Sequence, residues 1–180
     1  MRLHLVRHLT PQVDAGVCYG RTDLGVDPAL EALALPDLRL ALPRGVPLIS
    51  SPLRRCASLA AGLHQQVRFD ARLAELDFGS WEMRRWEDIA RAEIDAWAAD
   101  VVHYRPGGGE SVIDMARRIV DFYDSMRSAG HDAATVVCHA GAIRLLLARQ
   151  RSADPECMAR EAAEHPHPIA YGGVVVIDCV

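Results

Sequence analysis

Two apolar runs, far apart in the chain, each end in a histidine, and this pair limits the possible folds more than any other feature. The first run covers residues 2–6 and is followed by Arg7 and His8, while the second covers residues 135–138 and is followed by His139. Runs rich in leucine and valine are typical of buried strands. Because ligands collect at the carboxyl ends of strands in open α/β sheets, we expect both histidines at one such edge.

Strands and helices alternate along the rest of the chain. Further strands are expected at residues 46–50, 67–69 and 173–179, and helices at 28–35, 53–66, 86–99, 111–128 and 142–149. A turn-rich loop at residues 9–27 is well placed to cover a ligand, and a polar connection follows residue 149. This order predicts a three-layer α/β/α fold with a mostly parallel central sheet. We expect one domain over residues 1–180, with a small helical lobe inserted at about 77–110.

Composition excludes several classes of protein. The chain has 180 residues, half of them apolar, and a net charge of −4, which argues against binding nucleic acid through bulk charge. Its five cysteines are odd in number and lack CxxC spacing, so we expect reduced thiols in the cytoplasm. No stretch reaches membrane-spanning length, and no membrane partner is expected. The sequence carries no signal for the oligomeric state.

The residues around His8 suit phosphoryl transfer. A neutral imidazole can attack phosphorus, and an arginine can neutralise the phosphoryl oxygens. Adjacent strand residues face opposite ways, so Arg7 and His8 share a site only where the strand ends, as the turn at Thr10 indicates. A second cation source is the strand end and helix start at residues 50–55, where Arg54 or Arg55 can grip an anion.

Expulsion of an alkoxide also needs a proton donor. Glu75 is the first candidate, and Asp77 and Glu82 are alternatives. Near His139, the N–H groups that begin with Ala140 can hold a phosphate oxygen. The run Gly107–Gly109 is either a plain turn before a helix cap or brings Glu110 or Ser111 to the substrate. We assign no role to the other histidines that lack ligand spacing, namely His103, His131, His165 and His167.

Five motifs in order resemble those of the histidine phosphatase superfamily, also called phosphoglycerate mutase-like. They are Leu5-Val6-Arg7-His8, Ser51-Pro52-Leu53-Arg54-Arg55, Glu75-Leu76-Asp77-Phe78-Gly79-Ser80-Trp81-Glu82, Pro106-Gly107-Gly108-Gly109-Glu110-Ser111 and Val137-Cys138-His139-Ala140-Gly141. The resemblance implies a phosphohistidine intermediate on His8 and phosphate binding by Arg7, Arg55 and His139. It also implies that Glu75 is the proton donor and that no metal or other cofactor is required.

Two departures from the family pattern narrow the resemblance. Leu9 replaces the glycine that commonly follows the Arg-His pair, and Met83 stands where glycine often follows Trp-Glu. However, Arg-His-x-Thr-Pro together with residues 16–24 resembles the α-ribazole phosphatase branch. That resemblance implies a small-molecule phosphomonoester substrate, α-ribazole 5′-phosphate, which is hydrolysed in cobalamin assembly. Candidates for substrate contact on this loop are Thr10, Tyr19, Gly20 and Arg21.

Two alternatives stay open at this point. The same chemistry can serve another substrate, such as a phosphosugar, a phosphoglycerate or a phosphohistidine protein. A noncatalytic sensor of a phosphate ligand would keep the pocket without turnover, and the complete set of candidate residues disfavours it.

Overall fold

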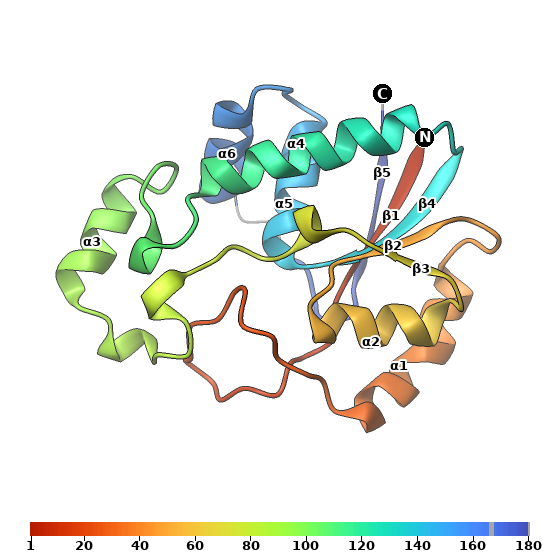
Figure 1. Ribbon diagram of the computed structural model, residues 1–180, viewed down its shortest axis with the longest axis horizontal. Helices are drawn as coiled ribbons and strands as arrows, with labels where there is room; N and C mark the ends of the chain where they lie inside the picture. Colours follow the sequence, from red (N-terminus) through yellow and green to blue (C-terminus); the bar gives the residue numbers. More distant parts are fainter. Residues whose placement is uncertain (166–167, 180) are drawn as a thin grey trace.

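Five strands form one sheet in the computed structural model, which describes residues 1–165 and 168–179. Across the sheet the strands are β3 (Val67–Phe69), β2 (Leu48–Ser50), β4 (Ala133–Cys138), β1 (Arg2–Arg7) and β5 (Val174–Asp178). Neighbouring strands pair in parallel except β5, which runs antiparallel to β1. The predicted mostly parallel sheet is confirmed, and its one reversed strand lies at an edge (Figure 1).

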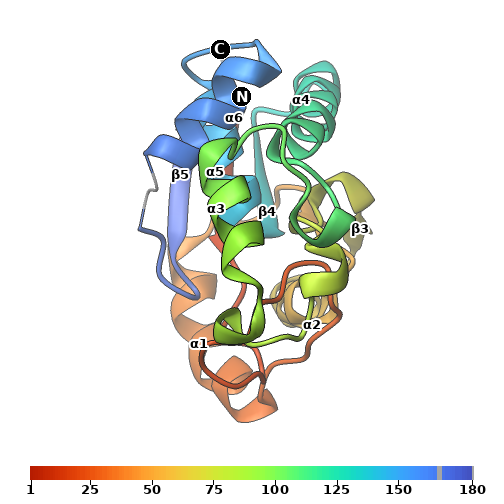
Figure 2. The same ribbon diagram turned by 90° about the vertical axis from the view of Figure 1, so that its left-hand side faces the viewer.

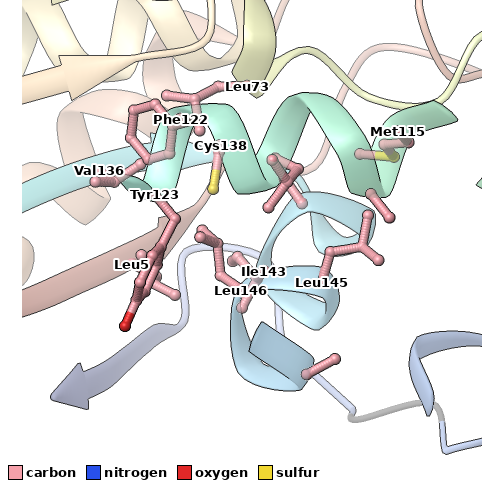
Figure 3. Packing of buried hydrophobic residues seen from close by; sticks show 14 of the residues in the cluster. Leu5, Leu73, Met115, Phe122, Tyr123, Val136, Cys138, Ile143, Leu145 and Leu146 are labelled. Carbon is pink, nitrogen blue, oxygen red and sulfur yellow. The ribbon is translucent and has the colours of Figure 1, made fainter. Parts of the chain in front are cut away.

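Helices cover both faces of the sheet, so the predicted three layers are confirmed (Figure 1). On one face α1 (Pro28–Ala41) packs beside α2 (Arg54–Leu63), and the other face carries α4 (Val112–Ser128), α5 (Ala140–Arg149) and α6 (Pro155–Glu164). Figure 3 shows Phe122 of α4 and Leu146 of α5 within the buried cluster that also contains Val136 of β4. Burying one such side chain stabilises the fold by about 1.5–3 kcal/mol.

The helix α3 (Arg91–Ala99) stands apart from these layers at one end of the molecule (Figure 1), the end that faces the viewer in Figure 2. It packs against a separate aromatic cluster in which Trp81 is fully buried and the rings of Trp86 and Trp97 stack 6.1 Å apart. The helix expected at residues 86–99 begins only at Arg91. A 3₁₀ turn at residues 86–88 and the non-helical backbone of Ile89 and Ala90 come before it. The 3₁₀ turns are η1 (Ala71–Leu73), η2 (Gly79–Trp81), η3 (Trp86–Asp88) and η4 (Pro106–Gly108).

Two predictions about helices were wrong. Pro36 does not end α1, which continues to Ala41. Pro36 and Ala32 are both exposed, so water can bond to the Ala32 carbonyl that loses its helical N–H partner. The polar connection expected after residue 149 contains α6. Its start carried a usable signal, because Asp154 caps the helix and Pro155 occupies the first turn.

The remaining boundaries differ by a few residues. The second strand begins at Leu48 instead of residue 46, since Pro47 has no N–H for a ladder bond. The helix expected at 53–66 ends at Leu63, and His64 is already extended. Ser111 caps α4 through a capping box with Asp114, as its predicted start requires. No helix among the described residues has the length and apolar character needed to cross a membrane.

Candidate active site at the carboxyl edge of the sheet

The two histidines meet where β1 and β4 end side by side. Arg7 pairs with Cys138 across these parallel strands, so the next residue of each strand lies at the same edge. The rings of His8 and His139 lie 5.0 Å apart between centroids, and both side chains are buried. The predicted convergence of the two histidines at one edge of the sheet is present in the structure.

The ring of His8 is held in one tautomer. Its Nδ1 lies 2.7 Å from the carbonyl oxygen of Leu9, and a carbonyl only accepts, so Nδ1 carries the proton. Burial lowers the pKa of His8 to about 3, and the charges of Arg55 and Arg7 act in the same direction against the opposing effect of the Leu9 bond. The ring is therefore neutral at pH 7, and its Nε2 bears a lone pair suited to nucleophilic attack.

His139 sits at the N-cap of α5 and is fully buried. Its Nε2 lies 2.8 Å from the hydroxyl oxygen of Ser51 and 3.4 Å from the Sγ of Cys56. Burial, followed by the charge of Arg55, lowers its pKa well below the usual value for histidine. An anion bound between the rings of His8 and His139 would raise the pKa of His139, against the effects of burial and of Arg55, and would favour a charged imidazole that donates hydrogen bonds.

Arg55 and Arg54, adjacent in sequence, have opposite surroundings. Arg55 is fully buried, and its guanidinium donates to the carbonyl of Thr22 at 2.7 Å and to that of Gly20. Arg54 has a side chain that is 67% exposed, and it pairs with Asp23. The structure thus places Arg55, and not Arg54, at the buried site, as the resemblance implied.

Arg7 reaches the site beside an aromatic residue that the sequence did not single out. Its guanidinium donates to the carbonyl of Ile169 and lies 3.8 Å from the ring centre of Tyr171. The hydroxyl of Tyr171 is 2.8 Å from that of Tyr19, which belongs to the loop after β1. Tyr171 lies just before β5, so only the reversed direction of that strand brings it to this edge, and the sequence carried no clear signal for that direction.

Glu75 lies against the first turn of α5. Its carboxylate accepts from the amides of Gly141 at 3.1 Å and Leu76 at 3.0 Å. A Cβ at position 141 would stand 2.3 Å from a carboxylate oxygen of Glu75, so only glycine allows this approach. Glu75 therefore contacts Gly141, which lies two residues beyond His139 in the chain, and this is a suitable place for a proton donor.

A cavity of about 540 Å³ opens beside Glu75. The polar side chains on its wall come from Tyr19, Glu75 and Arg144, and Ala140 and Gly141 close the end next to His139. Apolar side chains of α3, α4, α5 and nearby segments form most of the rest, among them Phe78, Ile94, Trp97, Val101, Met115 and Leu145. Its volume is that of a site for a drug-sized molecule.

The two alternative proton donors are engaged elsewhere. Asp77 accepts from the amide of Gly79 and lies 3.7 Å from the guanidinium of Arg21. Burial alone would raise the pKa of Glu82, but hydrogen bonds led by the Thr22 hydroxyl outweigh burial and lower that pKa. Glu82 is consequently ionised at neutral pH, unlike a group that must deliver a proton.

The remaining predicted residues are less closely joined to the histidine pair. The guanidinium of Arg21 lies 3.6 Å from the carboxylate of Glu110 and also approaches Asp77. Glu110 pairs with Arg118 as well, so these ion pairs join the loop after β1 to the segments around residues 77 and 110. Thr10 is exposed, and its side chain has no hydrogen bond to a residue that the structure describes. Gly20 contributes its backbone carbonyl, which accepts a hydrogen bond from Arg55.

The other histidines lie away from this edge. His103 pairs with Glu156 and His165 with Glu161, while His131 is an exposed residue two positions before β4. His167 lies outside the described residues.

The family model described as the histidine phosphatase superfamily, branch 1, matches residues 3–169. The chain belongs to the histidine phosphatase superfamily. Among solved structures, this superfamily member resembles the α-ribazole phosphatase of Shigella flexneri, with a TM-score of 0.83 and 26% identity over 99% of this chain and 90% of that one.

Two curated relatives point to different phosphatases. An adenosylcobalamin/α-ribazole phosphatase of Escherichia coli K12 is 31% identical over 51% of this chain and 47% of that protein. A protein of Hydrogenobacter thermophilus whose name is that of a phosphoserine phosphatase is 27% identical over 81% of this chain and 76% of its own length. These relatives agree on the class of enzyme, a phosphatase, and differ in the substrate that their names give.

Proposed function

We propose that this histidine phosphatase hydrolyses α-ribazole 5′-phosphate through a phosphohistidine intermediate. The observation that carries the proposal is the position of Glu75, between the buried histidine pair and a largely apolar cavity. α-Ribazole carries a dimethylated benzimidazole, an uncharged aromatic group, and burial of apolar surface in such a cavity favours its binding.

In the first step, Nε2 of His8 attacks phosphorus and the ester P–O bond breaks. The protonated carboxyl of Glu75 gives its proton to the departing 5′ oxygen, so the leaving group departs as a neutral alcohol. Arg7, Arg55 and His139 hold the phosphoryl oxygens and stabilise the charge that develops on them. Nδ1 of His8 stays bonded to Leu9 throughout and keeps the ring in position.

In the second step, a water molecule attacks the phosphohistidine. Glu75, now a carboxylate, takes a proton from that water as the P–N bond breaks, and inorganic phosphate and the original His8 are formed. Tyr19, Arg21 and Thr10 on the loop after β1 are the proposed contacts to the rest of the substrate, with Gly20 and Ala140 contributing backbone groups.

A phosphoester panel tests the substrate. We expect kcat/KM for α-ribazole 5′-phosphate to exceed that for phosphoserine or 3-phosphoglycerate by about tenfold or more, since an apolar contact of this kind contributes about 1–3 kcal/mol. A flat profile would reject α-ribazole phosphate and leave the phosphatase chemistry standing. Failure of His8 to take up an acid-labile, base-stable phosphoryl group in a brief substrate pulse would reject the chemistry itself.

A further inference from the structure

The carboxylate of Glu82 accepts hydrogen bonds from three successive residues of the loop after β1, Gly20 to Thr22. Its Oε2 accepts from the amides of Gly20 at 3.0 Å and Thr22 at 3.1 Å, and from the Thr22 hydroxyl. Its Oε1 accepts from the amides of Arg21 at 2.8 Å and Phe78 at 3.0 Å. Three successive amides directed at one anion form a nest, a backbone arrangement that depends on the negative charge at its centre.

The same loop holds Arg55 from its other side. The carbonyls of Gly20 and Thr22 accept the two Nη donors of that guanidinium. Among the described residues, no carboxylate forms a salt bridge with Arg55, and its Nε has no partner. The direction of this buried cation therefore depends on where two backbone carbonyls point.

One peptide unit joins the two sets of contacts. The carbonyl of Gly20 and the amide of Arg21 belong to the same planar peptide and point in opposite directions, since the bond is trans. Glu82 binds the N–H end of this unit and Arg55 binds the C=O end. Any rotation of the peptide that breaks one bond breaks the other as well.

We propose that Glu82 is a positioning residue that orients Arg55 for phosphate through the Gly20–Arg21 peptide. The inference rests on the proposed role of Arg55 as a phosphate ligand. Glu82 itself does not touch phosphate, because all its described contacts are to the loop and to Phe78. The loop thus couples a half-buried carboxylate, outside the reacting centre, to a guanidinium within it.

The variant Glu82→Gln separates this role from simple loop anchoring. Glutamine keeps the size of the side chain but replaces one acceptor with an NH₂ donor, which faces N–H groups that are also donors. The peptide should rotate, and Arg55 should lose its orientation. We expect the inhibition constant of inorganic phosphate to rise about tenfold, the effect of one hydrogen bond to a charged group.

A double-mutant cycle supplies the decisive comparison. Glu82→Gln, Arg55→Ala and the double variant are assayed for phosphate inhibition and for kcat and KM with p-nitrophenyl phosphate. If Glu82 acts through Arg55, Glu82→Gln raises the inhibition constant less than about twofold once Arg55 is gone. Additive effects would overturn the inference. An unchanged inhibition constant in Arg55→Ala alone would instead reject the phosphate role of Arg55.

A milder variant covers the case in which Glu82→Gln does not fold. Thr22→Val removes only the hydroxyl donor to Glu82, and we expect a rise of about two- to threefold in the phosphate inhibition constant, again dependent on Arg55. The control is Glu87→Gln, an exposed glutamate nearby in the chain that pairs with Arg85. A rise that persists in the Arg55→Ala background, or no rise at all, would overturn the inference.

Discussion

The two halves of the candidate site are built from different interactions. In the phosphate half, formed by Arg7, His8, Arg55 and His139, directional hydrogen bonds fix the polar side chains that the sheet edge brings together. In the apolar half, the 540 Å³ cavity beside Glu75, apolar side chains of α3, α4 and α5 form most of the wall. Under the proposed function, the chemistry would depend on fixed angles in the phosphate half, and the choice of substrate on size and polarity in the apolar half.

The largest expected effect comes from removing the nucleophile of the phosphate half. We predict that His8→Asn lowers kcat/KM with p-nitrophenyl phosphate by at least about a thousandfold, as loss of a covalent catalyst does elsewhere. Exposed His131→Asn is the matched control. Steady-state kinetics check this, and substantial turnover by His8→Asn would show that the phosphate half works without a phosphohistidine.

Glu75 lies between the halves, so its effect should depend on the leaving group. We predict that Glu75→Gln lowers kcat on α-ribazole 5′-phosphate by about a hundredfold, within the usual range for general acid catalysis. The loss on p-nitrophenyl phosphate should be much smaller, because p-nitrophenolate leaves without a proton. Equal losses on the two esters would remove Glu75 as the proton donor.

A charge placed in the apolar half should change selectivity and spare the chemistry. Val101→Asp puts a carboxylate on the cavity wall, and we predict a loss of about tenfold in kcat/KM for α-ribazole 5′-phosphate relative to p-nitrophenyl phosphate. Ala99→Asp, an exposed position at the end of α3, is the control. An unchanged ratio between the two substrates would mean that the cavity does not receive the leaving group.

The last prediction concerns stability and not activity. The folded-state pKa of His8, about 3, lies below its unfolded value of about 6.5, so its neutral burial stabilises the fold above pH 6.5. That contribution is lost as pH falls from 6.5 towards 3, by at most about 1.4 kcal/mol per pH unit. In urea unfolding, the free energy of unfolding should therefore fall less between pH 6.5 and pH 4 for His8→Asn than for the parent chain. Parallel dependences of the unfolding free energy on pH in the two chains would contradict the low pKa of His8.

The two halves also differed in how well the sequence predicted them. His8, His139 and Arg55 follow buried strands, and the carboxyl ends of parallel strands lie along one edge whatever the details of the loops. Local patterns therefore predicted both histidines at this edge and left Arg54 and Arg55 as alternatives, between which the family resemblance selected Arg55. The nest around Glu82 was missed, because it joins residues about sixty positions apart through backbone amides that every sequence contains.

The apolar half depends on packing that has no local signature. Its walls come from α3, α4, α5 and α6, and α6 lies in a segment whose sequence predicts a polar connection. Tyr171 was missed for a related reason, since its place follows from the reversed direction of β5. Amphipathic periodicity indicates which residues of a helix are buried, but not which other helix they face across a cavity.

Leu9 has a consequence for how this sequence can change during evolution. Its side chain packs within the core on the α1 and α2 face, and a Cβ at Gly172 would meet its Cδ2 at 2.9 Å. Gly172 also has a φ of +70°, and its amide donates to the carbonyl of Arg7 at 3.1 Å. A larger residue at position 172 would therefore meet two obstacles, the Leu9 side chain and a left-handed backbone that favours glycine, and shortening Leu9 removes only the first. We therefore expect position 172, beside Tyr171, to require glycine even in a variant with a smaller residue at position 9.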